Sequence, residues 1–234
     1  METAKGKTVS VLKWKESDGS VRQDIVAEEL ILSVYVNGRT CGVLRCSPWE
    51  QDELIAGYLF INGIIRTYED ICKLECAGDK LYVTCSERKN HQEEKKSASP
   101  QYIKADEVIS LMAVFSDMSD VFRKTGGAHS AAVSDGRSII TFTEDVSRHN
   151  ALYRLAGRCL RKGISFEDKI ILFSGRVPEE IMSAVIQLGC STIISVSAPT
   201  SAAVEIAGQN GVMLICFARG DRFNVYTCFE RLIR

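Results

Sequence analysis

Long apolar runs are absent from this sequence of 234 residues, and neither sign of charge predominates. A membrane-spanning helix needs about 18 or more consecutive apolar residues, and no stretch approaches that length. The segment Met1–Lys7 lacks the apolar core of a signal peptide, so we expect a cytoplasmic protein with no membrane partner. The net charge of -1 lacks the basic excess on which general nucleic-acid binders depend, so we expect no nucleic-acid partner.

Several nucleotide and metal motifs are also missing. The sequence has no Gly-x-x-x-x-Gly-Lys-Ser/Thr phosphate loop and no Gly-x-Gly-x-x-Gly dinucleotide fingerprint. Three histidines without paired ligand spacing give no zinc pattern, and the zinc deaminase signature is absent. We therefore expect no metal site and no catalytic site built on these motifs.

Cysteine is plentiful: there are nine, and the closest spacing is Cys72 to Cys76, so no Cys-x-x-Cys pair exists. An odd number of scattered cysteines argues against a disulfide framework. Those with apolar or β-branched neighbours are expected to be buried, reduced thiols: Cys41, Cys72, Cys85, Cys190 and Cys216.

The first half of the chain is rich in hairpin signals. Asn37-Gly38 separates two apolar runs, which is typical of a type I′ turn because both residues must adopt positive φ. Ser47-Pro48 predicts the start of a helix capped by Ser47, and Asn62-Gly63 predicts its end. Residues 86–104 carry no periodic apolar face. We therefore expect an N-terminal α+β domain over residues 1–104 that ends in a flexible polar loop.

Residues 105–234 alternate between helical and strand patterns, beginning with a helix predicted over residues 105–123. Such alternation predicts a mostly parallel sheet with helices on both faces. The overall fold class is thus α/β (α+β when both domains are considered). Ligands of open α/β sheets usually bind at the carboxyl ends of the strands.

Polar clusters punctuate this second half at predicted strand ends. Glycines and helix starts expose backbone N–H groups that bind anions, although plain turns and helix caps produce the same patterns. The candidate binding residues are Thr125, Gly126, Gly127 and His129; Arg148 and His149; Ser174, Gly175 and Arg176; Ser197, Pro199 and Thr200; and Phe217, Ala218, Arg219, Gly220, Asp221 and Arg222.

Two of these clusters carry the strongest signal for an anionic, nucleotide-like ligand. Arg148 falls in the first turn of a predicted helix, where a cation opposes the helix dipole, so a ligand or ion-pair role is favoured. Arg219 and Arg222 flank Gly220-Asp221 in a predicted tight turn. The planar guanidinium suits phosphate, and neighbouring aromatic rings can stack on a base.

Taken in order, the clusters resemble the formate dehydrogenase accessory protein (FdhD) family. The segments that carry the resemblance are Thr125–His129, Asp145–Ala151, Ser174–Arg176, Ser197–Thr200 and Phe223–Tyr226, together with Val36–Gly38, Cys46–Pro48 and Glu53–Leu59 in the first half. The resemblance extends from about Glu28 to Arg234.

This resemblance implies a cytidine-deaminase-like, three-layer α/β/α second domain and a homodimer. It also implies a sulfurtransferase role: a cysteine desulfurase passes sulfur to a Cys-x-x-Cys loop, and the protein transfers it to the molybdenum bis(molybdopterin guanine dinucleotide) cofactor of formate dehydrogenase. By the same resemblance, Phe217–Arg222 corresponds to a cofactor-binding segment.

The chain departs from the family pattern where the cysteine loop is expected, because no cysteine lies between Cys85 and Ala105. Ser147, Ala184 and Tyr153-Arg154 also replace usual family residues. This favours a cofactor carrier, or a diverged paralogue, over a sulfurtransferase, and no catalytic residue is assigned. Two other hypotheses remain open: an enzyme acting on a nucleotide-like substrate with His129 or His149 as base, and an interaction module with an empty cleft.

Overall fold

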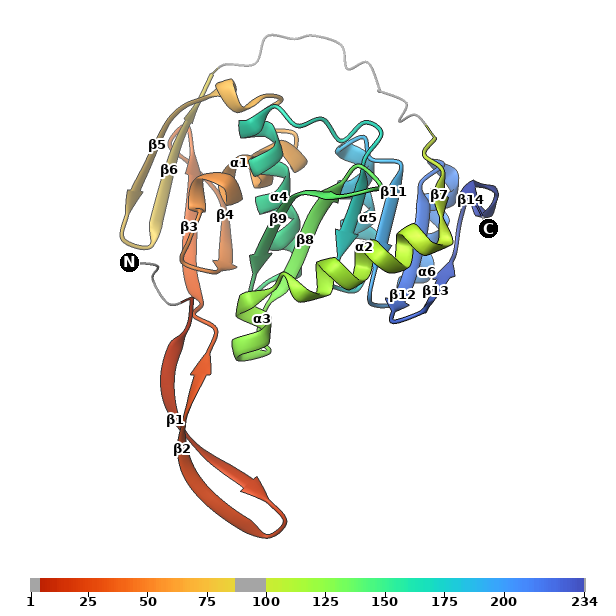
Figure 1. Ribbon diagram of the computed structural model, residues 1–234. Helices are drawn as coiled ribbons and strands as arrows, with labels where there is room; N and C mark the ends of the chain where they lie inside the picture. The colour runs from red at the N-terminus through yellow and green to blue at the C-terminus, as the bar shows by residue number, and fades with distance from the viewer. Residues whose placement is uncertain (1–4, 87–99, 234) are drawn as a thin grey trace.

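The N-terminal part of the chain forms a four-stranded sheet covered by one helix in the computed structural model, which describes residues 5–86 and 100–233 (Figure 1). The strand order is β4-β3-β6-β5, in which β3 and β6 run parallel and the other two pairs are antiparallel. Helix α1 packs its buried residues against this sheet. The elements are β3 (Leu30–Val36), β4 (Arg39–Cys46), α1 (Gln51–Ile61), η1 (Tyr68–Asp70), β5 (Ile71–Ala77) and β6 (Lys80–Cys85).

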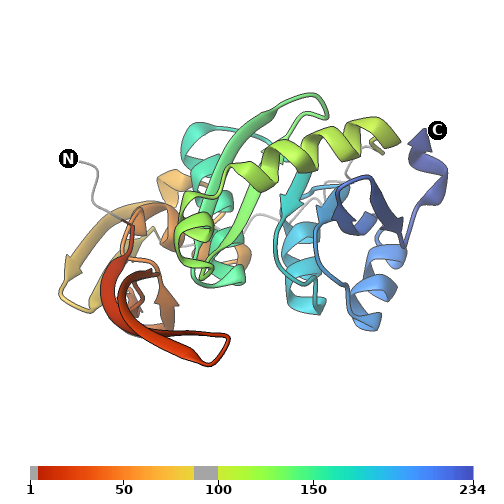
Figure 2. The ribbon, with the colours of Figure 1, turned by 60° about the horizontal axis from the view of Figure 1, so that its bottom comes forward.

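A separate hairpin of β1 (Lys7–Lys15) and β2 (Asp18–Val26) extends away from the body of the molecule (Figures 1 and 2). Its turn places Glu16 and Ser17 at positive φ. Because neither residue is a typical hairpin-turn residue, this hairpin was not predicted from the sequence. Large apolar side chains such as Trp14 and Val21 are exposed along it.

The second half is built on a six-stranded sheet in the order β13-β12-β11-β10-β8-β9. Two of the strand pairings, β10 with β11 and β11 with β12, are parallel, and the three remaining pairings are antiparallel. The expected mixed α/β fold is confirmed. The prediction of a mostly parallel sheet was wrong, because the outer strands β9 and β13 are joined to their neighbours by the hairpins β8–β9 and β12–β13, which are antiparallel. The strands are β8 (His129–Ser134), β9 (Ile139–Asp145), β10 (Ile170–Phe173), β11 (Thr192–Ser195), β12 (Met213–Arg219) and β13 (Arg222–Val225).

Helices cover both faces of this sheet (Figure 2). Helix α2 contributes Val108, Leu111 and Phe115 to the core on one face, and α4, α5 and α6 bury their apolar residues on the other. The remaining elements are β7 (Ile103–Lys104), α2 (Ala105–Asp117), α3 (Asp120–Thr125), α4 (Arg148–Lys162), α5 (Glu179–Gln187), α6 (Ser201–Gln209), η2 (Phe229–Arg231) and β14 (Leu232–Ile233), and β14 pairs with β7.

The single helix predicted over residues 105–123 is two helices, α2 and α3. Ser119 interrupts them: its hydroxyl oxygen accepts a hydrogen bond from the Phe122 N–H and donates one to the buried Glu144 carboxylate (2.9 Å). The predicted capping role of Ser47 was also wrong. Helix α1 begins after Glu50, and Ser47 is buried, where its hydroxyl accepts a hydrogen bond from the Val146 N–H.

Helices α1 and α4 join the two halves by crossing at a pair of glycines. A Cβ added to Gly57 would lie 1.7 Å from the Tyr153 carbonyl oxygen, and one added to Gly157 would lie 1.8 Å from that of Glu53. The two helix backbones are therefore in direct contact, at a distance that no other residue permits. The division of the chain into domains at residues 104 and 105 stays a prediction, and the expected flexible loop falls mainly on residues 87–99, outside the described ranges.

A buried ion pair fixes the α4 side of this contact. The fully buried Arg154 donates from Nε to Asp145 Oδ2 (2.8 Å), and its other nitrogens donate to the carbonyl oxygens of Ser47, Trp49 and Glu50. Every contact of this guanidinium thus links α4 to either β9 or the segment that precedes α1. No helix within the described ranges is long and apolar enough to cross a membrane.

Candidate functional site

The sheet topology brings all five predicted clusters to one edge of the six-stranded sheet, where edge means the side formed by the ends of the strands. Strands β10, β11 and β12 end there, as does β9, while β8 and β13 begin there. Each cluster lies directly at one of these strand ends. Their spatial order along the edge therefore follows the order of the strands, with the Arg148 cluster at β9 and the Arg219–Arg222 turn at the opposite end.

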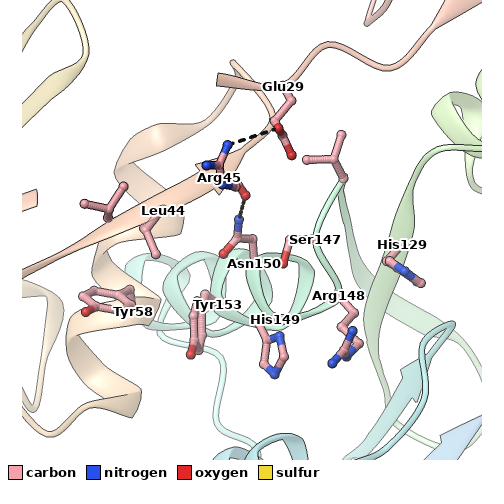
Figure 3. A pocket seen from close by; sticks show the side chains of 12 residues that line it. Glu29, Leu44, Arg45, Tyr58, His129, Ser147, Arg148, His149, Asn150 and Tyr153 are labelled. Atoms are coloured by element: carbon pink, nitrogen blue, oxygen red, sulfur yellow. Dashed lines mark hydrogen bonds and ion pairs between the residues drawn. The ribbon is translucent and has the colours of Figure 1, made fainter. Parts of the chain in front are cut away.

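A cavity of about 760 Å³ opens at the β9 end of this edge, between the N-terminal half and α4 (Figure 3). Its volume falls in the range of small-molecule sites. Of the predicted residues, His129, Arg148 and His149 line it. The other lining residues are Glu29, Val43, Leu44, Arg45, Tyr58, Val146, Ser147, Asn150 and Tyr153.

The cavity is closed on one side by contacts between β4 and α4. The Asn150 amide donates to the Arg45 carbonyl oxygen (2.7 Å), and Arg45 pairs with Glu29 (3.9 Å). The rings of Tyr58 and Tyr153 meet edge to face with centroids 5.6 Å apart. The glycine crossing of α1 and α4 thus places an aromatic wall beside the histidines.

The pKa values of both cavity histidines are lowered from 6.5, which favours the neutral form of each ring. Burial is the main cause that lowers the pKa of His129, followed by the cations Arg148 and Arg176. Burial, again followed by Arg148, lowers the pKa of His149. A neutral imidazole can serve as a hydrogen-bond donor, an acceptor or a general base, so the hypothesis of a histidine base remains a hypothesis.

Arg148 lines this cavity without a counterion among the described residues. Among the residues that the structure describes, its guanidinium makes no hydrogen bond or ion pair, and its Nε is buried without a partner. The first turn of α4 contains no acidic residue that could compensate it. The sequence left two roles open for Arg148, an ion pair or a ligand contact. No ion-pair partner lies within the described ranges, so an anionic ligand is the partner that would satisfy this side chain.

Ser174 and Gly175 contact these residues from the end of β10. The Ser174 hydroxyl lies 3.4 Å from His129 Nδ1, and a Cβ added to Gly175 would lie 3.0 Å from the Cβ of Arg148. Arg176, the next residue, is exposed and close enough to lower the pKa of His129. Three clusters that are distant in sequence therefore meet at one place.

Other candidate residues have local structural roles. Gly126 ends α3 with φ of 67°, and the Thr125 hydroxyl accepts a hydrogen bond from the Gly127 N–H (3.0 Å). Thr200 caps α6 by accepting from the Ala203 N–H (3.3 Å), and Pro199 bridges to Val177. These contacts do not involve a ligand, so the role of these four residues and of Pro199 in ligand binding stays a prediction.

The final cluster forms the predicted tight turn. Arg219 at the end of β12 lies opposite Arg222 at the start of β13 in the antiparallel register, and Gly220 and Asp221 connect them. Arg219 donates to the Val196 carbonyl oxygen (2.8 Å), beside Ser197, whose own carbonyl accepts from the Phe217 N–H (3.1 Å). Phe217 is 40% exposed and adopts φ of 54° at a bulge, while Ala218 is buried. Three strand spacings separate this turn from β8, or roughly 14 Å, so it lies outside the cavity.

The sequence did not indicate Glu29, Arg45, Tyr58 or Tyr153 as cavity residues. Tyr153 follows His149 by four positions, so the helical period alone could have placed the two on one face of α4. Glu29, Arg45 and Tyr58 enter the site only through the packing of the two halves, which no local pattern reveals.

The sequence profile of the FdhD/NarQ family matches residues 27–103 and 89–233. The chain is 34% identical to a protein named sulfur carrier protein FdhD from Listeria monocytogenes, over 96% of this chain and 98% of the relative. It is 31% identical to the protein of that name from Geobacillus kaustophilus, over 95% of each chain. The Bacillus subtilis protein of that name is 32% identical, over 94% of this chain and 95% of the relative.

The fold is also similar to that of a solved structure. A crystal structure described as a formate dehydrogenase accessory protein from Desulfotalea psychrophila superimposes with a TM-score of 0.85. It covers 98% of this chain and 100% of the other, at 21% sequence identity. At this identity the match shows a shared fold.

Proposed function

Because the chain belongs to the FdhD/NarQ family, we propose that it is an accessory protein of formate dehydrogenase that binds the guanine-dinucleotide form of the molybdenum cofactor. The observation that carries this proposal is the meeting of five polar clusters at one sheet edge. The names of the relatives support the client enzyme, and the chemistry of the edge supports the ligand.

The charge along the edge suits a ligand with several phosphate groups. Arg176, Arg219 and Arg222 are exposed, and Arg148 lines the cavity without a counterion among the described residues. Guanidinium groups bind phosphate through paired N–H donors. A bis-dinucleotide cofactor is long enough to reach from the cavity towards the Arg219–Arg222 turn, and the exposed Phe217 ring offers a surface for a guanine base.

A calorimetric titration with GDP, which represents one arm of the cofactor, tests this ligand. Wild-type protein is expected to bind GDP, and Arg222→Ala is expected to weaken binding by roughly tenfold or more, because a charge-assisted contact is lost. Arg137→Ala, an exposed arginine in the β8–β9 turn at the opposite edge, is the matched control. If neither wild type nor control binds GDP, the proposed ligand is wrong and the interaction-module hypothesis becomes the better one.

Sulfur transfer is the second candidate function, because the curated relatives are named sulfur carrier proteins. We infer that this chain carries cofactor rather than sulfur. A persulfide carrier needs an accessible thiolate, whereas burial raises the pKa of Cys46, Cys159 and Cys216 to about 12. The exposed thiols, Cys72 and Cys76, lie on β5, which does not border the cavity.

Mass spectrometry after incubation with a cysteine desulfurase and cysteine tests this inference. We expect no persulfide on any cysteine under conditions in which a relative with a Cys-x-x-Cys loop is modified. A persulfide that passes from this chain to a molybdenum cofactor would establish sulfur transfer and contradict the inference.

The remaining partner and compartment proposals rest on the family and on cysteine chemistry. All nine cysteines are free, which is typical of a reducing compartment and supports the cytoplasm. We propose a homodimer from the family resemblance alone, and sedimentation analysis of the purified protein would test it.

A further inference from the structure

The cavity end formed by Arg148 and His129 has an excess of positive charge and hydrogen-bond donors. Arg148 has no counterion among the described residues, and its buried Nε is without a partner. A buried N–H group of a cation that lacks a partner costs free energy, and an oxyanion would remove that cost. The carboxylates of Asp145 and Glu29 are already paired, with Arg154 and Arg45 respectively. Glu180 acts electrostatically on His149, but the ion pairs of the described residues include none between Glu180 and Arg148.

The position of Arg148 is fixed by the backbone beside it. Gly175, at the end of β10, would place a Cβ 3.0 Å from the Cβ of Arg148 and 3.1 Å from the Phe173 ring. The lack of a side chain at Gly175 therefore lets β10 and the start of α4 come together. Figure 3 shows the Arg148 side chain between His129 and His149.

The Ser174 hydroxyl is the hydrogen-bond partner of His129 Nδ1 among the described residues, and it favours one position of the imidazole proton. The Ser174 hydroxyl oxygen already accepts a hydrogen bond from the Ser130 N–H (2.7 Å), and it lies 3.4 Å from His129 Nδ1. If the hydroxyl donates to Nδ1, both groups are satisfied, and a neutral His129 must then carry its proton on Nε2. The reverse arrangement would leave the hydroxyl hydrogen without an acceptor among the described residues.

The electrostatic surroundings of His129 favour its neutral form. Burial lowers the pKa of His129, Arg148, Arg176 and His149 lower it further, and Asp145 alone raises it. A neutral imidazole with its proton on Nε2 is a donor that adds no charge. His129 and Arg148 both line the cavity, so such an imidazole and the guanidinium would supply two kinds of donor to it.

We propose that Arg148 and His129 form a binding site for a phosphate group, with Arg148 providing the charge and His129 Nε2–H providing a second donor. This site deepens the proposed function, since it rests on a phosphate-bearing ligand at the sheet edge. It lies roughly 14 Å from the Arg219–Arg222 turn and is separate from it. Its phosphate comes either from a nucleotide arm or from free phosphate.

Nitrogen-15 NMR of the histidine rings tests the site directly, because the chain has only three histidines. His129→Gln and His149→Gln assign the signals. In the free protein, His129 is expected to be neutral with its proton on Nε2, and Ser174→Ala is expected to remove this preference. Inorganic phosphate and GDP are expected to shift the His129 signals and raise the pKa of its ring, whereas guanosine is not.

The arginine variants separate binding from folding. Arg148→Gln is expected to weaken the phosphate response by at least roughly tenfold, Arg148→Lys by less, and the control Arg137→Gln not at all. Arg148→Gln should also raise the pKa of His129 in the free protein, because a cation is removed. This rise in the pKa of His129 shows that Arg148 acts on the ring, and it can be measured even if the affinity for phosphate is low.

The outcomes distinguish this site from the proposed function. If GDP binds by calorimetry and His129 does not respond, the phosphate site is wrong while the proposed function stands. If phosphate shifts His129 but GDP binds nowhere, the site stands with free phosphate as its ligand, and the proposed function fails. A response to guanosine alone, or an unchanged response in Arg148→Gln, overturns the site.

Discussion

Arg154 connects the two halves through a buried side chain. It is fully buried, and its partners are Asp145 and three backbone carbonyl groups. Removal of one member of a buried pair leaves an uncompensated charge, which typically costs about 3–5 kcal/mol.

We therefore expect Arg154→Ala to lower the free energy of unfolding by about 3–5 kcal/mol, measured by urea denaturation. The exposed Arg137→Ala is the control and should change it by less than about 0.5 kcal/mol. An equally small effect of Arg154→Ala would show that the buried ion pair does not hold the halves together.

The histidines of the cavity predict how stability depends on pH. Their pKa values are lowered from 6.5 in the folded state, so the unfolded chain binds more protons as the pH falls below 6.5. The free energy of unfolding should therefore be at its full value above pH 6.5 and decrease as the pH falls towards the folded pKa values.

Urea denaturation across this range should show that decrease in wild type and a weaker one in His129→Gln/His149→Gln. The carboxyl pKa values of Asp70 and Asp135 are lowered from 3.8, so their effect on stability begins at lower pH than that of the histidines, whose unfolded pKa is 6.5. An identical pH profile in the double variant would mean that the histidines are not the titrating groups.

Three residues of the cavity, His129, Arg148 and His149, could be predicted from the sequence because each stands beside a strand end in a polar cluster. Arg154 could not, since a charged residue inside a helical pattern is more often solvated than buried. Cys72 was predicted to be buried and is exposed, because it lies on the outer face of the edge strand β5.

The crossing of α1 and α4 is the element-level contact that shapes the cavity. Both Gly57 and Gly157 face a carbonyl oxygen of the partner helix at a distance that excludes any Cβ. Alanine at either position must push the helices apart, which would also move Tyr58 away from Tyr153.

Gly57→Ala is expected to destabilise the protein by about 3 kcal/mol or more, at the upper end of overpacking effects. Gly208→Ala in α6 is the matched control, because its nearest atom lies 3.7 Å from the added Cβ. The control should be neutral or stabilising by up to about 1 kcal/mol, since alanine favours a helix over glycine. Equal stability of the two variants in thermal unfolding would contradict the close crossing.

Elements were predictable wherever local chemistry defines them. Asn37 and Gly38 both adopt positive φ, as the hairpin signal required, and Asn62-Gly63 ends α1. Long-range contacts caused the errors: Glu144 draws Ser119 out of the predicted helix, and Asp145 holds Ser47 away from α1. The pairing direction of β8 with β10 is likewise set by the whole sheet and not by either strand.

At the scale of the whole molecule, the burial of thiols predicts a graded chemical reactivity. Cys72 and Cys76 are exposed, Cys41 and Cys228 are half-buried, and the other five are buried. Native protein treated with an alkylating reagent should be modified first at Cys72 and Cys76, and at the five buried thiols only after unfolding. Peptide mass mapping that finds rapid labelling of Cys190 or Cys216 in the native protein would contradict the packing of the core between the six-stranded sheet and helices α4, α5 and α6.

The central claim is that the sheet edge binds a nucleotide-bearing ligand, and a crystal structure of the protein with GDP tests it most directly. We expect the nucleotide at this edge, in contact with the Arg219–Arg222 turn or with its phosphates at Arg148 and His129. Nucleotide bound elsewhere on the molecule, or an edge that stays empty at saturating GDP, would contradict the claim.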